Sequence, residues 1–237
     1  MFLLVIFNKK LGRMLLVAGF LTGVLIVLST TLWNITVMTS TTGPIYQGST
    51  DKRAVAIAIN VDWGEKYLPQ LLDILEKGNS KVTFFVTGRW ASKFPALVKE
   101  MDKKGHEVGN HGYSHSHPDR LSKEENRQEI LKAEKVLMQI TGKKPKLFAP
   151  PYGEKGKHVV EAASELGYFT IMWTIDTIDW KEGRRSSQII EKVLSKLENG
   201  AIILMHPTTV TVEALPVILR SLNEKGYNIV PVSQIIN

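Results

Sequence analysis

The sequence predicts an α/β fold in which a parallel sheet is surrounded by helices. Seven β-rich runs follow residue 53 of this 237-residue chain, and amphipathic stretches separate many of them. This alternation is typical of a doubly wound open sheet or of a distorted TIM-like (β/α) barrel with seven or eight units. The chain has no cysteine, so disulfides, thiolate metal sites and cysteine nucleophiles are excluded.

The predicted strands and helices follow one another in order along the chain. The β-rich runs cover residues 54–61, 81–88, 106–111, 145–150, 168–175, 201–206 and 227–232. Helical patterns include residues 68–78, 95–105, 124–142 and 213–226. Several of these patterns end in glycine, the residue that most often follows a helix C-terminus.

An uncharged apolar segment, residues 14–33, precedes this region. At about 1.5 Å per residue a helix of this length spans a hydrocarbon core of about 30 Å. Basic residues precede the segment but do not follow it closely, which favours a cytoplasmic N-terminus. We therefore expect a single-pass anchor in the cell membrane with the domain on the extracytoplasmic side. A cleaved signal peptide is the alternative.

The remaining boundaries follow from composition. Residues 1–13 form the predicted cytoplasmic N-terminus, and residues 34–52, rich in Ser, Thr and Gly, form a predicted stem. The domain is expected over residues 53–237. The net charge is +7, but residues 1–50 hold three basic and no acidic residues, so the excess beyond residue 50 is only four. This charge gives no indication of nucleic-acid binding.

Polar side chains follow the ends of several predicted strands. They are Asn60, Asp62, His111, His115, Tyr152, Asp176, Asp179 and His206. The carboxyl ends of parallel strands meet at one edge of a sheet, where β/α folds place their active sites. The sequence therefore predicts one functional pocket built from these residues.

The residue types in this set suit metal-assisted chemistry. His111 and His115 have the spacing of two ligands on one helical turn, and Asp62 is a suitable third ligand. Two histidines and one carboxylate leave a coordination position open for water, as in catalytic sites. His206 is the candidate for proton transfer, and Asp176 could hold its second ring nitrogen. Asp179 is expected to cap a helix.

Taken together, five ordered motifs resemble those of the polysaccharide deacetylase family, the NodB-homology carbohydrate esterases. The motifs are NVDWG at 60–64, HGYSH at 111–115, APPYG at 149–153, DTIDW at 176–180 and LMH at 204–206. The apolar segment, the short stem and the NVDWGE variant further resemble the membrane-anchored members associated with sporulation. The resemblance covers residues 53–237.

The resemblance implies a distorted (β/α) barrel that removes N-acetyl groups from a cell-wall or spore-envelope polysaccharide such as peptidoglycan. It implies one divalent metal ion, expected to be zinc, held by Asp62, His111 and His115. Leu204 and His206 would line the acetyl pocket, with His206 protonating the leaving amine and Asp176 tuning it. The Tyr152 backbone amide would stabilise the oxyanion, and Trp180 would form part of the pocket wall.

The chain departs from the family pattern in its first and third motifs. The family has two adjacent aspartates, base then metal ligand, and an arginine where this chain has Ala149. Either Asp62 is the base and Trp63 replaces the ligand, or Asn60 occupies the base position and Asp62 is the ligand. The second alignment is favoured because losing the base carboxylate and its arginine together leaves no unpaired buried charge.

Two functional hypotheses follow from these departures. The first is a metal-dependent N-deacetylase with weakened base catalysis, because the loss of general-base assistance costs about 10²–10⁴-fold in rate. The second is a catalytically impaired homologue that binds glycan or has a structural role in sporulation.

Overall fold

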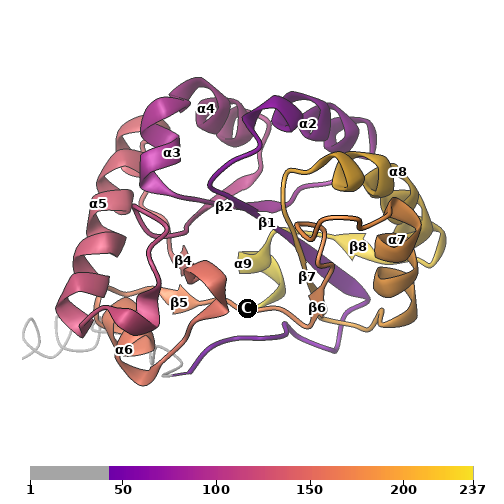
Figure 1. Ribbon diagram of the computed structural model, residues 1–237. Helices are drawn as coiled ribbons and strands as arrows, with labels where there is room; N and C mark the ends of the chain where they lie inside the picture. The colour runs from indigo at the N-terminus through magenta and orange to yellow at the C-terminus, as the bar shows by residue number, and fades with distance from the viewer. Residues whose placement is uncertain (1–42, 237) are drawn as a thin grey trace, which may run out of the picture. The chain divides into compact units, whose positions relative to one another are not determined.

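The computed structural model describes residues 43–236, which fold around one parallel sheet of eight strands (Figure 1). The strand order is β5-β4-β3-β2-β1-β7-β6, and β8 pairs with the beginning of β1. The strands are β1 Ala54–Val61, β2 Thr83–Val86, β3 Glu107–Asn110, β4 Leu147–Phe148, β5 Phe169–Thr170, β6 Ile175–Asp176, β7 Ile202–Met205 and β8 Asn228–Ile229. The predicted α/β barrel class is confirmed.

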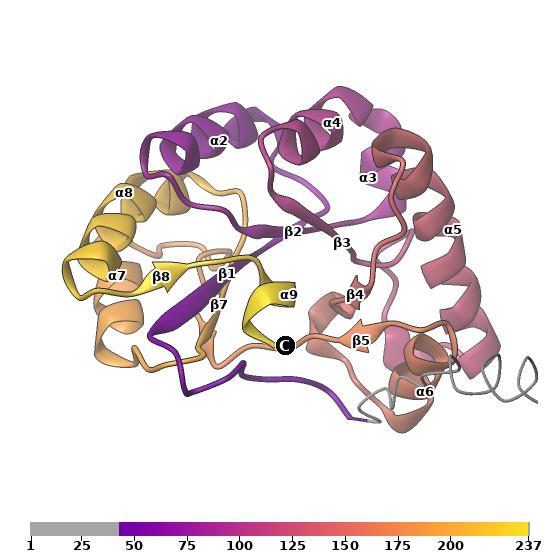
Figure 2. The same ribbon diagram turned by 180° about the vertical axis from the view of Figure 1, so that it is seen from behind.

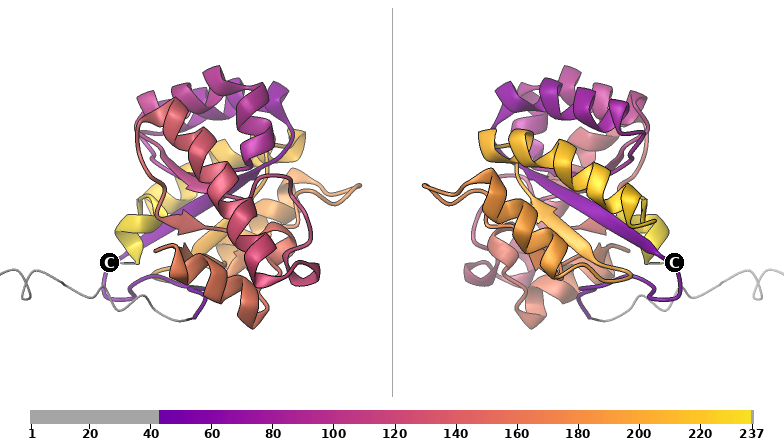
Figure 3. Two further views of the ribbon diagram at one scale, coloured as in Figure 1. Left: turned by 90° about the vertical axis from the view of Figure 1, so that its left-hand side faces the viewer. Right: turned by 90° about the vertical axis from the view of Figure 1, so that its right-hand side faces the viewer.

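Helices cover the outer face of the curled sheet (Figures 1 and 2). Figure 3 shows α5 beside α6 in one side view and α7 beside α8 in the other, and both pairs are in contact. The outer helices are α2 Leu68–Lys77, α3 Gly88–Lys93, α4 Pro95–Lys103, α5 Lys123–Thr141, α6 Lys157–Glu165, α7 Ser186–Ser195 and α8 Thr209–Glu224. The short α9, Val232–Ile235, instead packs against the concave face of the sheet.

The alternation of side chains along β1 separates the two faces of the sheet. Val55, Ile57, Ile59 and Val61 pack under the outer helices. The alternate positions, Ala54, Ala56 and Ala58, face the barrel interior, where small side chains leave room for α9. Asn60 is the next residue on this inner face, which places its side chain at the carboxyl end of the strand.

The barrel is open between its edge strands β5 and β6, and the chain segment before β1 lies across this opening. Ile45 forms a bridge to Ile171, and Gln47 forms a bridge to Ala201. The Ser49 backbone N–H donates to the Ile235 carbonyl at 2.7 Å. Residues 45–49 of the predicted stem therefore contact the domain that the sequence predicts over residues 53–237.

The predicted strand at 168–175 is two strands in the structure. β5 and β6 lie at opposite edges of the sheet, and residues 171–174 cross the open side between them. Ile171 and Met172 are buried in this crossing, which explains why the apolar pattern continues without a break.

The expectations for residues 1–13, 14–33 and 34–42 concern a part of the chain outside the described residues. Within residues 43–236, none of the helices has the length and apolar character needed to cross a membrane.

Candidate functional site

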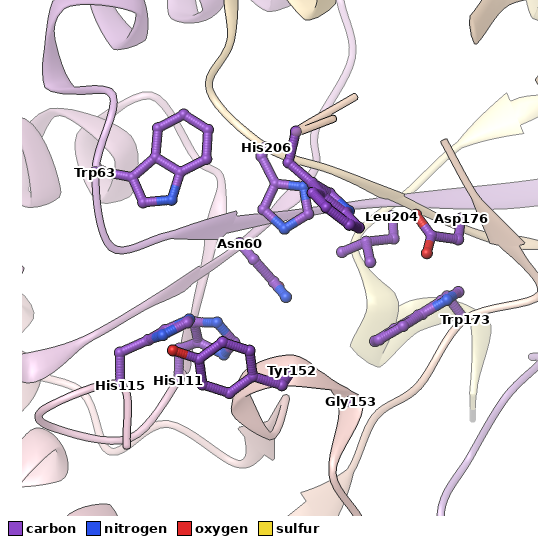
Figure 4. Close-up of a pocket in the computed structure, with 11 residues that line it drawn as sticks. Asn60, Trp63, His111, His115, Tyr152, Gly153, Trp173, Asp176, Leu204 and His206 are labelled. Atoms are coloured by element: carbon purple, nitrogen blue, oxygen red, sulfur yellow. The ribbon is translucent and has the colours of Figure 1, made fainter. Parts of the chain in front are cut away.

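A cavity of about 540 Å³ opens at the carboxyl ends of the strands (Figure 4). This volume falls in the range of about 300–1,000 Å³ that small-molecule sites occupy. Eight of the predicted site residues line it: Asn60, His111, His115, Tyr152, Asp176, Trp180, Leu204 and His206. Trp63, Gly153 and Trp173 complete the lining. Asp62 is not among the lining residues.

His111 is a fully buried, neutral imidazole. Its Nδ1 lies 2.6 Å from the Ala149 carbonyl oxygen, which can only accept, so Nδ1 carries the proton. Burial, followed by the neighbouring His115, lowers the pKa of His111 to about 3. The Nε2 lone pair is therefore available as a ligand or an acceptor at neutral pH.

His115 lies beside His111, with 5.0 Å between the ring centroids. Its backbone φ of 56° is in the left-handed region, which few non-glycine residues adopt. Burial lowers the pKa of His115; the charge of Asp62 opposes this effect and the charge of Arg89 adds to it. Both predicted histidine ligands are thus side by side.

The carboxylate that orients His206 is Asp179, not the predicted Asp176. Asp179 Oδ1 accepts from His206 Nδ1 at 2.8 Å, and Oδ2 accepts from the His206 backbone N–H at 2.6 Å and from Thr211 Oγ1 at 2.5 Å. The Asp179 side chain is 0% exposed. Since Nδ1 donates to this carboxylate, the imidazole keeps Nε2 as its second functional nitrogen.

Asp176 instead organises the backbone of its own loop. Its Oδ1 accepts from the Ile178 backbone N–H at 2.8 Å. Ile178 has a φ of 54°, which is strained for a β-branched residue. This turn separates the two carboxylates, so Asp176 faces the cavity while Asp179 is buried against His206. The expectation that Asp179 caps a helix is also wrong.

Asn60 reaches the cavity from the inner face of β1 (Figure 4). It is buried, and its Oδ1 has no hydrogen-bond partner among the described residues. Ala149 is 3% exposed and packs in the inner core. The two positions that the family resemblance associates with the base and its arginine therefore hold an amide and a methyl group in the favoured alignment.

Aromatic side chains form the rim of the cavity. Trp63 and Trp180 are 43% and 56% exposed, and Tyr152 is 57% exposed. The Trp63 ring is parallel to that of His206, with centroids 6.2 Å apart. Trp63 and Trp180 also line an adjoining groove of about 280 Å³.

Tyr152 is held in place by a contact that sequence reasoning missed. Its ring stacks on His117, with centroids 3.9 Å apart, and His117 pairs with Glu154 at 2.7 Å. Tyr152 adopts a φ of 58°, a left-handed conformation. The residues Trp63, Trp173 and His117 were not predicted as site residues; the only signal was the clustering of aromatic and histidine residues near the motifs.

The described residues do not assemble the three-ligand metal site that the sequence predicts. His111 and His115 face the cavity, but Asp62 forms a salt bridge with Arg89 at 2.8 Å and accepts from Thr87 Oγ1 at 2.7 Å. No group of three His, Asp or Glu side chains within residues 43–236 is arranged to hold a metal ion. Two imidazoles without a carboxylate fit a divalent ion poorly.

Comparison with known proteins identifies the class to which this fold and site belong. The family model for polysaccharide deacetylases matches residues 47–171, more than half of the chain. The chain belongs to the polysaccharide deacetylase family.

The similar proteins include a named deacetylase and a protein described as a pseudoenzyme. The uncharacterized protein YlxY of Bacillus subtilis (strain 168) is 42% identical over 194 residues, which cover 82% of this chain and 60% of YlxY. A peptidoglycan-N-acetylglucosamine deacetylase of Bacillus cereus is 35% identical over 190 residues, covering 78% of this chain and 69% of the relative. The crystal structure of wild-type BA3943, a CE4 family pseudoenzyme from Bacillus anthracis, matches with a TM-score of 0.80 and 39% identity, covering 83% and 70% of the two chains.

Proposed function

We propose that the cavity binds an N-acetylated sugar of cell-wall peptidoglycan and that hydrolysis of the N-acetyl group is slow or absent. The observation that carries this proposal is the pairing of an intact proton donor with a missing base. His206 is held by a buried carboxylate, whereas in the alignment favoured from the sequence the side chain at the base position is the amide of Asn60. An amide does not accept a proton at neutral pH, so general-base assistance is lost.

The parts of the site that would recognise the sugar are in place. Leu204 presents an apolar side chain to the cavity, where it would contact the acetyl methyl group. The exposed rings of Trp63 and Trp180 would stack on the sugar. The Nε2 of His206 would accept from the N–H of the acetamido group of the bound sugar. These interactions need no base and support binding without turnover.

The names of the similar proteins support both the proposed sugar ligand and the proposed loss of hydrolysis. The B. cereus relative is named for N-acetylglucosamine in peptidoglycan, which suggests the ligand class. BA3943 is described as a pseudoenzyme, and a mutant of it with restored enzymatic activity matches this chain at 38% identity and a TM-score of 0.80. The peptidoglycan assignment also agrees with the expectation that residues 14–33 tether the domain outside the membrane.

An active metal-dependent N-deacetylase is the second candidate. The observation that favours it is the pair of neighbouring histidines, of which His111 is neutral with Nε2 free. In this family a divalent metal ion would polarise the acetyl carbonyl and activate water. His206 would then protonate the leaving amine, as it would in any member with this motif.

Binding and acetate release, measured in parallel on the full chain in mild detergent, separate the two candidates. The ligand is an N-acetylglucosamine oligomer, followed by tryptophan fluorescence, and acetate is assayed with excess zinc. We expect saturable binding and little acetate from the wild type, and increased acetate from the Asn60→Asp, Ala149→Arg double variant. Rapid wild-type acetate release that His206→Ala abolishes would support the second candidate. Absence of both binding and acetate in every variant would overturn the proposal.

A further inference from the structure

The groove of about 280 Å³ beside the cavity shares Trp63 and Trp180 with it. One wall of the groove is the loop between β6 and α7, which projects from the surface of the domain (Figure 3). The other side is formed by Tyr67 and by the first residues of α8. Because the two tryptophans line both hollows, a glycan with one sugar in the cavity can place its next sugar in the groove.

Arg184 lines this groove with hydrogen-bond donors that the domain does not use. Its Nη2 donates to the Thr177 carbonyl at 3.2 Å, which holds the guanidinium against its own loop. Its Nε is buried and has no hydrogen-bond partner within residues 43–236. Buried polar atoms in folded proteins are nearly always paired, so this orphaned donor points to an acceptor supplied by a ligand.

The same wall carries positive charge that the domain leaves uncompensated. Within the described part of the chain, neither Arg184 nor Lys181 forms an ion pair. Two carboxylates also line the groove, but Asp179 is 0% exposed and pairs with His206, whereas Glu182 is exposed. One exposed carboxylate beside two unpaired cations leaves an excess of positive charge on this wall.

We propose that the groove binds a sugar that carries a carboxylate, and that Arg184 is the residue that recognises this carboxylate. In peptidoglycan, alternate sugars bear a lactyl ether with a carboxyl group, whereas a polymer of N-acetylglucosamine alone is neutral. A guanidinium binds a carboxylate through charge-assisted hydrogen bonds, often two in parallel. The shared tryptophans would contact both sugars. The inference rests on the proposed function, because it places the second sugar relative to the N-acetylated sugar in the cavity.

The expected selectivity follows from the partial exposure of the groove. A charge-assisted hydrogen bond contributes more than a neutral one, but an ion pair near solvent is weakened by water and by salt. We therefore expect the carboxylate to improve binding on the order of tenfold at low ionic strength. This preference should decrease as the salt concentration rises, because the groove is open to solvent.

Isothermal titration calorimetry of the full chain in mild detergent tests the inference. The ligands are a peptide-free peptidoglycan tetrasaccharide with free lactyl carboxylates and the same tetrasaccharide with these groups converted to carboxamides, which keeps their shape and removes their charge. We expect the wild type to bind the carboxylate form about tenfold more tightly. Arg184→Gln should bind both forms alike, with an unchanged affinity for the carboxamide form. Arg220→Gln, exposed towards the other end of α8 and outside both linings, is the matched control and should keep the preference.

The possible outcomes separate this inference from the proposed function. Equal wild-type affinity for the two forms would overturn the inference, and binding of the carboxamide form would still support the proposed function. A preference that persists in Arg184→Gln, or that Arg220→Gln removes equally, would also overturn it. Failure of the wild type to bind either form would overturn both. Circular dichroism melting identifies a variant that does not fold. In that case Arg184→Lys, which keeps the charge but not the forked geometry, should show a reduced preference, and an undiminished one would count against Arg184.

Discussion

His206 is paired with Asp179 in the structure and not with Asp176, as the sequence analysis expected. Substitution of each aspartate by asparagine tests this assignment. Asp179→Asn keeps the size of the side chain but replaces one carboxylate oxygen with an NH₂ group. Three donors converge on Asp179, namely the two N–H groups of His206 and Thr211 Oγ1. In the variant the NH₂ group faces a donor unless the His206 proton moves from Nδ1 to Nε2, and the charged acceptor shared by all three donors is lost in either case. We expect a loss of about 2–4 kcal/mol in the free energy of unfolding.

Asp176→Asn is the matched control because it makes the same chemical change three residues away. Asp176 accepts one backbone N–H and is partly exposed, so we expect a loss of about 1 kcal/mol or less. Urea unfolding of both variants gives the comparison. In addition, ¹⁵N NMR of the His206 imidazole should show the Nδ1–H tautomer in wild type and in Asp176→Asn, and its loss in Asp179→Asn. An equal or larger loss of stability in Asp176→Asn would refute the assignment.

Three further outcomes are expected. Ala149→Arg alone should lower the free energy of unfolding by about 3–5 kcal/mol because Ala149 is buried. Adding Asn60→Asp should recover part of this loss because the new carboxylate supplies the counter-charge. Urea unfolding of the single and double variants measures the coupling energy between the two positions. Burial lowers the pKa of His106 from 6.5 to about 4, so the unfolded chain binds this proton more readily. The contribution of neutral His106 to the free energy of unfolding is fully present above about pH 6.5 and is lost as the pH falls towards 4, about 3 kcal/mol in all. His106→Asn should therefore make the free energy of unfolding less dependent on pH in this range. Trp180→Ala should weaken binding of an N-acetylglucosamine oligomer about tenfold, measured by isothermal titration calorimetry, with unchanged melting temperature because Trp180 is 56% exposed.

Local sequence patterns predicted much of the fold because they report burial. The run at 54–61 corresponds to β1 without a shift, since a strand with both faces covered is apolar throughout. The run at 168–175 was misassigned for the same reason: Ile171 and Met172 are buried in a crossing segment rather than in a strand. Burial alone does not distinguish these two cases. The contacts of residues 43–52 could not be predicted from the sequence either, because they depend on the opening between the edge strands of the barrel.

The candidate site was predicted as a set of residues more successfully than as a set of contacts. The strand-end argument placed six of its residues around one cavity, and the family resemblance added Trp180 and Leu204. The turn at Ile178 decides which carboxylate reaches His206, and the sequence does not predict the positive φ of this residue. The pairing of Asp62 with Arg89 joins residues from the ends of two neighbouring strands. Residue types at strand ends indicate which chemistry is available, but local geometry decides which groups are already engaged.

Among the described residues, Asp176 is the one carboxylate that lines the cavity, and this scarcity of charge supports the proposal of binding without turnover. In the alignment favoured from the sequence, Asn60 and Ala149 replace a carboxylate and its arginine with a neutral side chain and a methyl group. Asp62 keeps its charge but is paired with Arg89, and Asp179 is enclosed by His206 and Thr211. The cavity thus presents the neutral imidazole of His111, the amide of Asn60, aromatic rings and the carboxylate of Asp176 to its ligand. A neutral N-acetyl sugar needs hydrogen bonds and stacking of this kind, whereas its hydrolysis needs charge placed where the transition state develops it.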